Sequence, residues 1–284
     1  MKVSTDKILK KNQDKQDVEI SNWKIQDGTG KIIVILIALT VVLFLINLTP
    51  AFAAYPLITD DASTQGKGNF QLEMNSEFGR TNLNGLTTET TSVTSVLSCG
   101  IMDQMDAILS APYLQARRDD SRGTTTEMGI SDITLEVKWR FYEKDGLSMA
   151  LKPGILLPTG DESKNLGIGK VNYSFFFIAT KELEPWAFHL NLGYRRHENE
   201  VDERVDIWNV SLASEFNLTK KLTMVGNIGT ERNPDPSSNL HPAFILGGFI
   251  YSLAEKINIS LGVNYGLNRN DNFYSVLAGI SLKF

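Results

Sequence analysis

The stretch DITLEVKWRF, residues 132–141, alternates strictly between polar and apolar side chains. Its apolar members are Ile133, Leu135, Val137, Trp139 and Phe141. Successive side chains of a β-strand point to opposite faces, so this period of two predicts a strand with one apolar and one polar face. Its length is close to the roughly ten residues with which a tilted strand crosses a bilayer. Alternation alone fits a soluble β-sandwich equally well, so the choice depends on the rest of the chain.

The same alternation recurs and predicts about twelve strands. They are expected at 69–79, 88–99, 105–116, 130–142, 147–157, 171–181, 186–197, 205–217, 221–232, 243–253, 257–267 and 273–284. Aromatic residues such as Trp186, Trp208 and Tyr265 lie near strand ends, where the aromatic girdles of membrane barrels belong. The polar faces carry many small residues, which a crowded barrel interior needs. Both features favour a membrane barrel over a sandwich.

The connections between the expected strands alternate in length. The short ones are 100–104, 143–146, 182–185, 218–220 and 254–256; the longer, polar ones are 117–129, 158–170, 198–204 and 233–242, with 80–87 and 268–272 on the same side. Short turns at one end and long loops at the other are typical of bacterial outer-membrane barrels. We therefore expect an all-β fold, a single antiparallel up-and-down transmembrane β-barrel of about twelve strands, after an N-terminal signal segment.

The N-terminal region predicts export. Residues 32–48 form an uncharged apolar run after Lys31, and Ala51-Phe52-Ala53 supplies a small-residue cleavage motif. A positive flank, an apolar run and small residues together predict a signal peptide cleaved before Ala54. An uncleaved anchor is the alternative, since the run approaches the length of a spanning helix. The expected organisation is an extended N-terminal region and signal peptide at 1–53 and an outer-membrane barrel at 54–284.

The expected location is the bacterial outer membrane, with its lipid bilayer as one partner. The last expected strand ends at Phe284, and a terminal aromatic residue is what the barrel-assembly machinery typically reads in this class, so that machinery is a second expected partner. A small-molecule permeant is the third. The net charge of −5 does not indicate nucleic acid. Cys99 is the only cysteine, so no intramolecular disulfide can form.

Two stretches resemble a known family. Residues 56–78 carry T-D-D ahead of the first strand, and residues 129–177 carry G-x-x-D, K-x-R-F and P-T-G-D. These motifs resemble the Phenol_MetA_deg group of outer-membrane proteins, named for an association with phenol degradation and often labelled transporters. The resemblance covers most of residues 56–195. It implies an outer-membrane barrel that handles small hydrophobic or aromatic compounds. The chain departs from the family's G-x-G-T-G-type run at residues 167–170, which read GIGK.

Charged residues on the polar faces are the candidate functional residues of the lumen. They are Glu136, Lys138, Arg140, Lys152, His189 and Arg195. Charges of both signs in a narrow lumen predict either a selective constriction or a salt-bridged interior that fills a small barrel. A carboxylate or phenolate substrate would make the basic members steering groups.

Two turn motifs are further candidates. Thr59-Asp60-Asp61 is expected to form a capped periplasmic turn, with a cation site as the alternative. Pro158, Thr159, Gly160 and Asp161 likewise favour a turn, because proline fixes φ and glycine permits positive φ. A gating or substrate-recruiting role for the loop at 158–170 is the functional alternative.

The expected function is passive movement of small molecules through the lumen. The segment between Ala54 and the first strand is too short for the plug domain of an energy-coupled transporter. A non-conducting structural or binding barrel is the first alternative, and a membrane-embedded hydrolase is the second. His189 is expected to face inward, His197 and His241 lie at the rim or in loops, and the mature chain has no G-x-S-x-G motif. The sequence therefore predicts no enzyme, no catalytic residues, no metal site and no cofactor.

Overall fold

A computed structural model describes residues 55–83, 86–121, 123–268 and 272–284 of the chain. The predicted signal peptide and its cleavage before Ala54 lie outside these residues. Within the described part, no helix is both long enough and apolar enough to cross a membrane. The single helical element there is the short 3-10 helix η1 (Glu162–Lys164).

Thirteen strands form one antiparallel sheet. They are β1 (Phe70–Leu83), β2 (Leu86–Met102), β3 (Met105–Asp120), β4 (Gly123–Ile130), β5 (Ile133–Lys144), β6 (Leu147–Leu157), β7 (Asn172–Leu183), β8 (Trp186–Arg196), β9 (Asp206–Asn217), β10 (Leu222–Glu231), β11 (Ala243–Ala254), β12 (Ile257–Leu267) and β13 (Asn272–Lys283).

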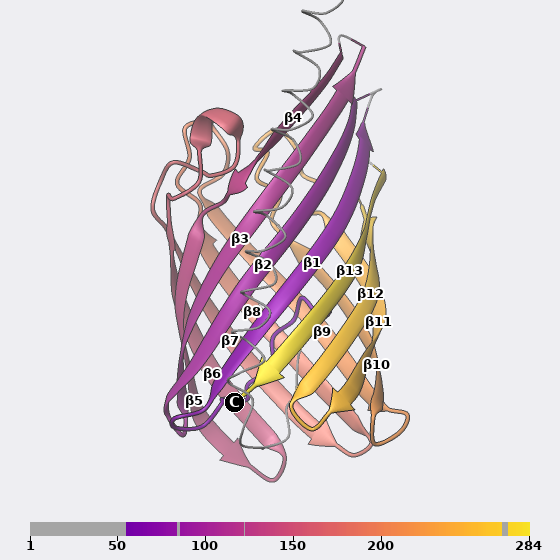
Figure 1. The fold of residues 1–284 in the computed structure, drawn as a ribbon. Coiled ribbons are helices and arrows are strands. Elements are labelled where there is room, and N and C mark those ends of the chain that lie inside the picture. Colours follow the sequence, from indigo (N-terminus) through magenta and orange to yellow (C-terminus); the bar gives the residue numbers. More distant parts are fainter. Residues whose placement is uncertain (1–54, 84–85, 122, 269–271) are drawn as a thin grey trace, which may run out of the picture. The chain divides into compact units, whose positions relative to one another are not determined.

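The sheet closes into a barrel because β1 pairs with both β2 and β13, and β2 pairs with β3 (Figure 1). At the closure, the backbone N–H of Phe70 donates to the Phe284 carbonyl at 2.8 Å, and the N–H of Phe284 donates to the Phe70 carbonyl at 2.9 Å. β4 and β5 pair with successive halves of β3, so twelve strands close the barrel and β4 is one extra strand. The predicted all-β, up-and-down barrel is confirmed.

The junction of β4 and β5 departs from the expected single strand at 130–142. Ile130 lies opposite Tyr113 and Thr134 lies opposite Ser110, so three residues of one strand face two of β3. This is a β-bulge, which bends a strand and redirects its side chains. The bulge turns Asp132 toward the loop at 158–170.

Two predicted loops are wrong, because residues 80–87 and 117–129 are mostly strand. β1, β2 and β3 have 14, 17 and 16 residues, more than the roughly ten needed to cross a bilayer. Their outer ends are polar and rich in threonine, whose branched Cβ favours strands. These polar ends extend beyond the lipid, where a β-hairpin needs no apolar outer face.

The two faces of the barrel differ as alternation predicts. Large apolar side chains are exposed on the outer face, among them Leu261, Val263 and Ile245. Near one end of the barrel, Trp186 stacks on Phe188 at 5.9 Å between ring centroids. Near the other end, Tyr194 of β8 lies opposite Trp208 of β9. These rings occupy the girdle positions expected of a lipid-facing barrel.

The loop after β6 is fastened to the bulge by Asp132, which is 4% exposed. Its carboxylate accepts the backbone N–H of Gly160 at 2.9 Å and of Ile168 at 2.7 Å. Thr159 adds two bonds, since its Oγ1 donates to the Ser131 carbonyl and accepts from the Ile133 N–H, both at 3.0 Å. Residues of the motifs G-x-x-D and P-T-G-D therefore bind each other and attach the loop to the bulge. We call this set of hydrogen bonds the joint.

We expect Asp132→Ala to release this loop. Removing the acceptor leaves two partly buried N–H groups without a partner, which costs about 1–3 kcal/mol. Amide hydrogen exchange at Gly160 and Ile168 should accelerate about ten- to hundredfold. Asp161→Ala is the matched control, because the Asp161 carboxylate reaches only Ser163 and Lys164. Equal acceleration in both variants would contradict the joint.

Candidate functional site

Residues 55–65, which precede β1, lie inside the barrel, and we call them the lumen segment. The Tyr55 hydroxyl donates to the Ser76 carbonyl of β1 at 2.7 Å. Further along, the N–H groups of Ile58 and Thr59 donate to Asn227 Oδ1 of β10 at 2.8 and 3.0 Å. The segment therefore crosses the lumen from one wall to another. The predicted periplasmic position of Thr59-Asp60-Asp61 is wrong, because Thr59 and Asp60 find their partners on the barrel wall. The expected local cap is present at Asp61, whose carboxylate accepts the Ser63 N–H at 2.6 Å.

Apolar contacts hold both ends of the crossing. Leu57 packs among buried residues of the β9–β11 and β13 walls, and Ala62 packs against Ala150 and Ile178 of β6 and β7. Both segment residues are buried, Ala62 completely. Removing such apolar area from water stabilises the inserted position by about 25 cal/mol per Å2.

Glycines make room for the first residues of the segment. A Cβ atom on Gly248 or Gly262 would lie 2.9 Å from Pro56 Cγ, and one on Gly279 would lie 2.5 Å from Tyr55 Cδ1. These glycines come from three adjacent strands, β11, β12 and β13. The small residues predicted for the polar faces thus leave space for the chain's own segment.

Polar side chains of the wall bind the second half of the segment. The Ala62 N–H donates to Thr180 Oγ1 at 2.9 Å, and the Gln65 N–H donates to the Asp106 carboxylate at 3.0 and 3.1 Å. Thr180 and Asp106 are buried, so these bonds are shielded from water. The segment is held by side chains rather than by a strand ladder.

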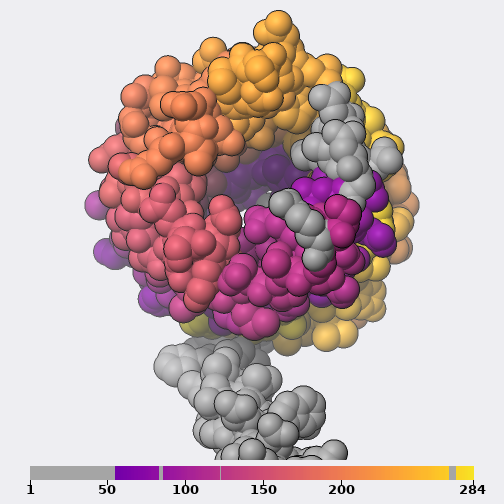
Figure 2. Space-filling view, turned by 90° about the horizontal axis from the view of Figure 1, so that it is seen from above, coloured from indigo at the N-terminus to yellow at the C-terminus, as the bar shows by residue number. Residues whose placement is uncertain are grey.

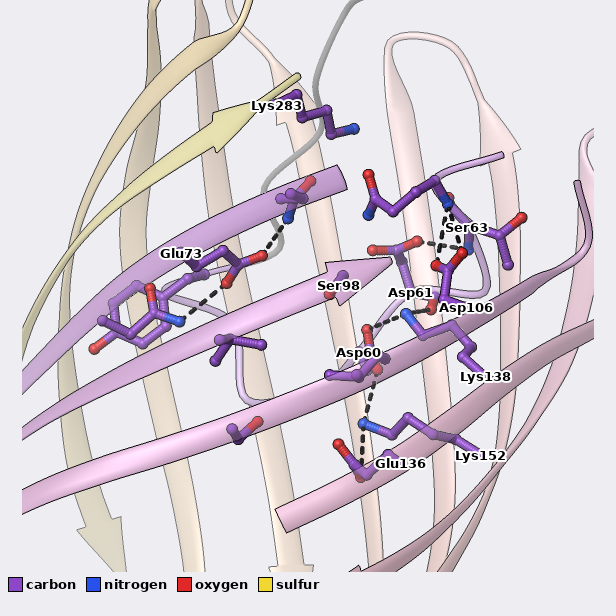
Figure 3. A pocket seen from close by; sticks show the side chains of 18 of the residues that line it. Asp60, Asp61, Ser63, Glu73, Ser98, Asp106, Glu136, Lys138, Lys152 and Lys283 are labelled. Atoms are coloured by element: carbon purple, nitrogen blue, oxygen red, sulfur yellow. Dashed lines mark hydrogen bonds and ion pairs between the residues drawn. The ribbon is translucent and has the colours of Figure 1, made fainter. Parts of the chain in front are cut away.

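Asp60 lies at the centre of a buried charge cluster, which comprises Asp60, Glu136, Lys138 and Lys152 (Figure 3). Lys138 Nζ is 2.8 Å from Asp60 Oδ1, and Lys152 Nζ is 2.9 Å from Asp60 Oδ2. Lys152 also lies 3.4 Å from Glu136 Oε1. Lys138 donates in addition to the Asp61 carbonyl at 3.0 Å. One carboxylate of the lumen segment therefore joins β5 to β6.

The charges of the cluster balance, with two carboxylates against two ammonium groups. Burial alone would raise the pKa of the Asp60 carboxyl, but Lys138 and Lys152 outweigh it and hold that pKa well below its usual range. Asp60 therefore stays ionised while it is inserted. If it left, both lysines would lose a direct ion pair, and only Glu136 beside Lys152 and Asp106 opposite Lys138 would remain, which is costly in a low dielectric.

Cavities lie on both sides of the lumen segment. One of about 540 Å3 reaches toward the C-terminal end of the barrel and is lined by Asp61, Asp106 and Lys283 (Figure 3). Two others, of about 340 and 420 Å3, open toward the long loops. From that end a central hollow is visible, with indigo residues of the N-terminal part at its floor (Figure 2). Ile58 lines the first cavity and one of the outer cavities, so the segment separates them.

The structure brings together three of the six predicted lumen residues, Glu136, Lys138 and Lys152. Arg140 lies instead beside the β2–β3 turn, 3.2 Å from Glu143 and within 3.3 Å of the Asp103 carbonyl. Arg195 is paired with Glu231 in the outer half of the lumen. The four basic steering candidates are thus already matched by acidic partners.

The predicted loop residues lie away from the cluster. Pro158, Thr159, Gly160 and Asp161 follow β6 at the end with the long loops, and Asp161 caps η1 through the Ser163 N–H at 3.1 Å. Thr159 and Gly160 contact residues 131–133, whereas the Asp161 carboxylate contacts Ser163 and Lys164.

The histidines occupy three separate settings. His189 is buried on the inner face of β8, 3.0 Å from Thr180 Oγ1 and 3.4 Å from Glu215. His197 pairs with Glu203 at 2.9 Å, and His241 packs on Trp208. Among the described residues, no group of three or more His, Cys, Asp or Glu side chains could hold a metal ion.

Asp60 is the central residue that sequence reasoning placed wrongly. The available signal was a pair of inward lysines on adjacent strands, Lys138 and Lys152, whose inward acidic neighbours are Glu136 and Asp106. A buried cation requires a partner, and the carboxylates of T-D-D were still unassigned. No local pattern shows that residues 55–65 fold inward, because their partners on the barrel wall lie 21 to 169 positions away.

A closed antiparallel barrel with aromatic girdles and an occupied lumen has the fold of bacterial outer-membrane β-barrels. The chain belongs to the Phenol_MetA_deg family, described as the MetA-pathway of phenol degradation, whose model matches residues 55–284. The resemblance noted in the sequence is thereby confirmed and extended to the later strands. No curated protein sequence matches the chain.

Solved structures with a similar fold share little sequence with this chain. An outer membrane channel from Pseudomonas putida F1 has a TM-score of 0.60 at 13% identity, over 79% of this chain and 98% of that one. The translocator domain of the autotransporter NalP from Neisseria meningitidis has a TM-score of 0.52 at 8% identity, over 75% and 88%. The β domain of the Bordetella autotransporter BrkA has a TM-score of 0.51 at 13% identity, over 77% and 100%.

We expect Asp60→Asn to loosen the lumen segment. Removing one member of a buried ion pair typically costs about 3–5 kcal/mol, so hydrogen exchange at the Ile58, Thr59, Ala62 and Gln65 amides should accelerate at least about a hundredfold. Asp61→Asn is the matched control, because it removes the same charge from the adjacent residue, whose carboxylate accepts the Ser63 N–H. Unchanged exchange in Asp60→Asn would refute the central role of the cluster.

The lowered pKa of Asp60 also sets a pH window. A carboxyl whose pKa is depressed by folding contributes its full stabilisation above its ordinary pKa of about 4, and loses it only as the pH falls toward the depressed value. Corrected for intrinsic rates, protection of the segment amides should stay constant from about pH 8 to 5 and decline below about pH 4. A decline centred near pH 6 would point to another group.

Proposed function

We propose that the protein is a passive outer-membrane channel for small molecules and that the lumen segment is its gate. The observation that carries this proposal is the arrangement of cavities on both sides of the segment, with Ile58 lining one on each side. Withdrawal of residues 55–62 would join these cavities into one path. The similarity in fold to an outer membrane channel and membership of the family support it.

The outer cavities favour a small, uncharged, ring-like permeant. The cavity of about 340 Å3 has Ile58 at its base, Phe176 and Phe244 in its walls, and Asn191 and Asn209 as hydrogen-bonding groups. An apolar pocket with a few polar groups is typical of small-molecule sites. Because Arg195, the basic residue that lines this cavity, is already paired with Glu231, an aromatic compound with a neutral hydroxyl fits better than a carboxylate or phenolate. The phenol association of the family agrees with this choice.

The attachment of the segment suits a gate. Side-chain hydrogen bonds and one ion-pair cluster hold it, so it can leave without breaking the barrel ladder. Cleavage before Ala54 would leave a free end one residue before Tyr55. A free end lowers the barrier to withdrawal, because nothing on that side has to move with it.

Single-channel recording of the purified protein in planar bilayers tests the gate. Gly262→Val places a side chain where Pro56 Cγ would lie 2.9 Å from the new Cβ, so it should displace the segment and raise the open probability severalfold. Gly247→Val is the control, since a Cβ there meets nothing within 4 Å. Asp60→Asn should act like Gly262→Val. Folded, inserted and silent protein in every variant would favour the non-conducting binding barrel instead.

Export and assembly belong to the same proposal. We expect the mature protein to begin at Ala54 and to reach the outer membrane through assembly machinery that reads Phe284. Membrane fractionation with N-terminal sequencing tests the first part, and an intact N-terminal region would indicate an uncleaved anchor. Phe284→Ala should lower the amount of heat-modifiable barrel, because it also removes the stacking on Phe70 at 5.9 Å. A Phe70→Ala control separates that stacking from recognition.

A further inference from the structure

Two lysines are neighbours at the end of the barrel where the C-terminus lies (Figure 1). Lys256 belongs to the turn between β11 and β12, and Lys283 is the last residue of β13. The Lys283 N–H donates to the Lys256 carbonyl at 3.1 Å, so the two residues lie opposite each other on adjacent chain segments. Like charges at opposite positions destabilise a pair of strands. The arrangement therefore requires negative charge close by.

Both lysines belong to the inner face of the barrel. Lys256 shares the face of Asn258, which is 3% exposed, because side chains two residues apart point the same way. Lys283 lines the cavity of about 540 Å3. Ile259 and Ile280 lie on the opposite face of the same strands and are exposed to lipid. A ligand of the two lysines therefore has to come from the aqueous phase rather than from the bilayer.

Lys256 and a neighbouring hydroxyl group are buried without hydrogen-bond partners. Lys256 is 3% exposed, and its Nζ finds no partner among the described residues. Ser281 is also 3% exposed, and its Oγ has none within the same part of the chain. Ser281 lies opposite Asn258 and two residues before Lys283, so the side chains of Lys256, Ser281 and Lys283 border one position on the inner wall. A buried ammonium group without a counter-charge is costly.

The neighbouring strand β1 does not supply the missing charge. Glu73 lies opposite Ser281, but its two oxygens accept the side-chain amides of Gln71 and Asn75. The remaining carboxylates of the cavity belong to the lumen segment, bind it, or pair with Lys152. An anion from outside the chain is left to balance the two lysines.

We propose that Lys256, Lys283 and Ser281 bind a small soluble oxyanion at this end of the barrel. Two ammonium groups and one hydroxyl group are hydrogen-bond donors, and the oxygens of a phosphate or a carboxylate accept from all three. The cavity that Lys283 lines gives the anion access from water. Bound there, the anion would hold the last two strands together beside the closure with β1. The site shares no residue with the charge cluster and does not depend on the proposed channel function.

Thermal unfolding of the purified protein in detergent, followed by loss of its heat-modifiable gel band, tests the site. Inorganic phosphate is the first probe and acetate is the second, with sodium chloride of equal ionic strength as the reference. At a few-fold excess over its dissociation constant, an oxyanion should raise the unfolding temperature by about 2–4 °C, because a ligand of the folded state stabilises it. The rise should saturate. An equal rise with chloride would indicate charge screening and would overturn the site.

Lys256→Met distinguishes an anion site from a lysine that is satisfied in another way. In chloride buffer this variant should unfold at a higher temperature than the unmodified protein, since it removes a buried charge without a partner, and it should not respond to phosphate. Lys221→Met is the matched control, because Lys221 is exposed in the turn before β10 at the same end of the barrel. A lower unfolding temperature in chloride, or an unchanged response to phosphate, would contradict the proposal.

Ser281→Ala tests the site if Lys256→Met does not fold. Loss of a hydrogen bond to a charged ligand should raise the phosphate concentration at half-saturation about tenfold. Ser260→Ala is the control, since Ser260 lies on the same inner face of β12 but beyond Asn258. An unchanged half-saturation concentration in Ser281→Ala would refute the role of the hydroxyl group and with it the site.

Discussion

The ion pairs that Asp60 makes with Lys138 and Lys152 are the interaction on which the organisation of the lumen depends. Two lysines facing each other across adjacent strands cannot remain charged and buried without a counter-ion. Glu136 and Asp106 supply negative charge from the wall, and the chain supplies the one carboxylate that contacts both lysines by folding its own N-terminal segment inward. The segment's course across the lumen follows from this requirement, because Asp60 can reach both lysines only from inside the barrel.

The remainder of the lumen fits around that placement. A twelve-stranded barrel encloses little more than side chains can fill, and here the glycines of β11, β12 and β13 clear the space for Tyr55 and Pro56. Leu57 and Ala62 then use the two apolar patches of the inner wall, while Asn227 and Thr180 satisfy the backbone N–H groups between them. Each contact is modest, and together they hold a segment that has no secondary structure of its own.

The cluster links the lumen segment to the wall, because Asp60 contacts Lys138 of β5 and Lys152 of β6. A change in the position of the segment would therefore be felt in the wall, since it would leave the two lysines facing each other. The joint between Asp132 and the loop at 158–170 lies nearer the end of the barrel with the long loops. It shares no residue with the charge cluster.

The barrel, its approximate strand number and its family could be predicted from the sequence, because strand alternation, turn spacing and family motifs are local patterns. The sequence also placed Glu136, Lys138 and Lys152 on the inner face, since a period of two assigns faces without knowledge of partners. The fold was needed to show that residues 55–65 enter the lumen, that the bulge at Asp132 splits the fourth expected strand, and that Arg140 and Arg195 lie apart from the cluster. Those outcomes depend on pairings between positions far apart in the chain, and the energy of a buried charge is set by which partner it meets.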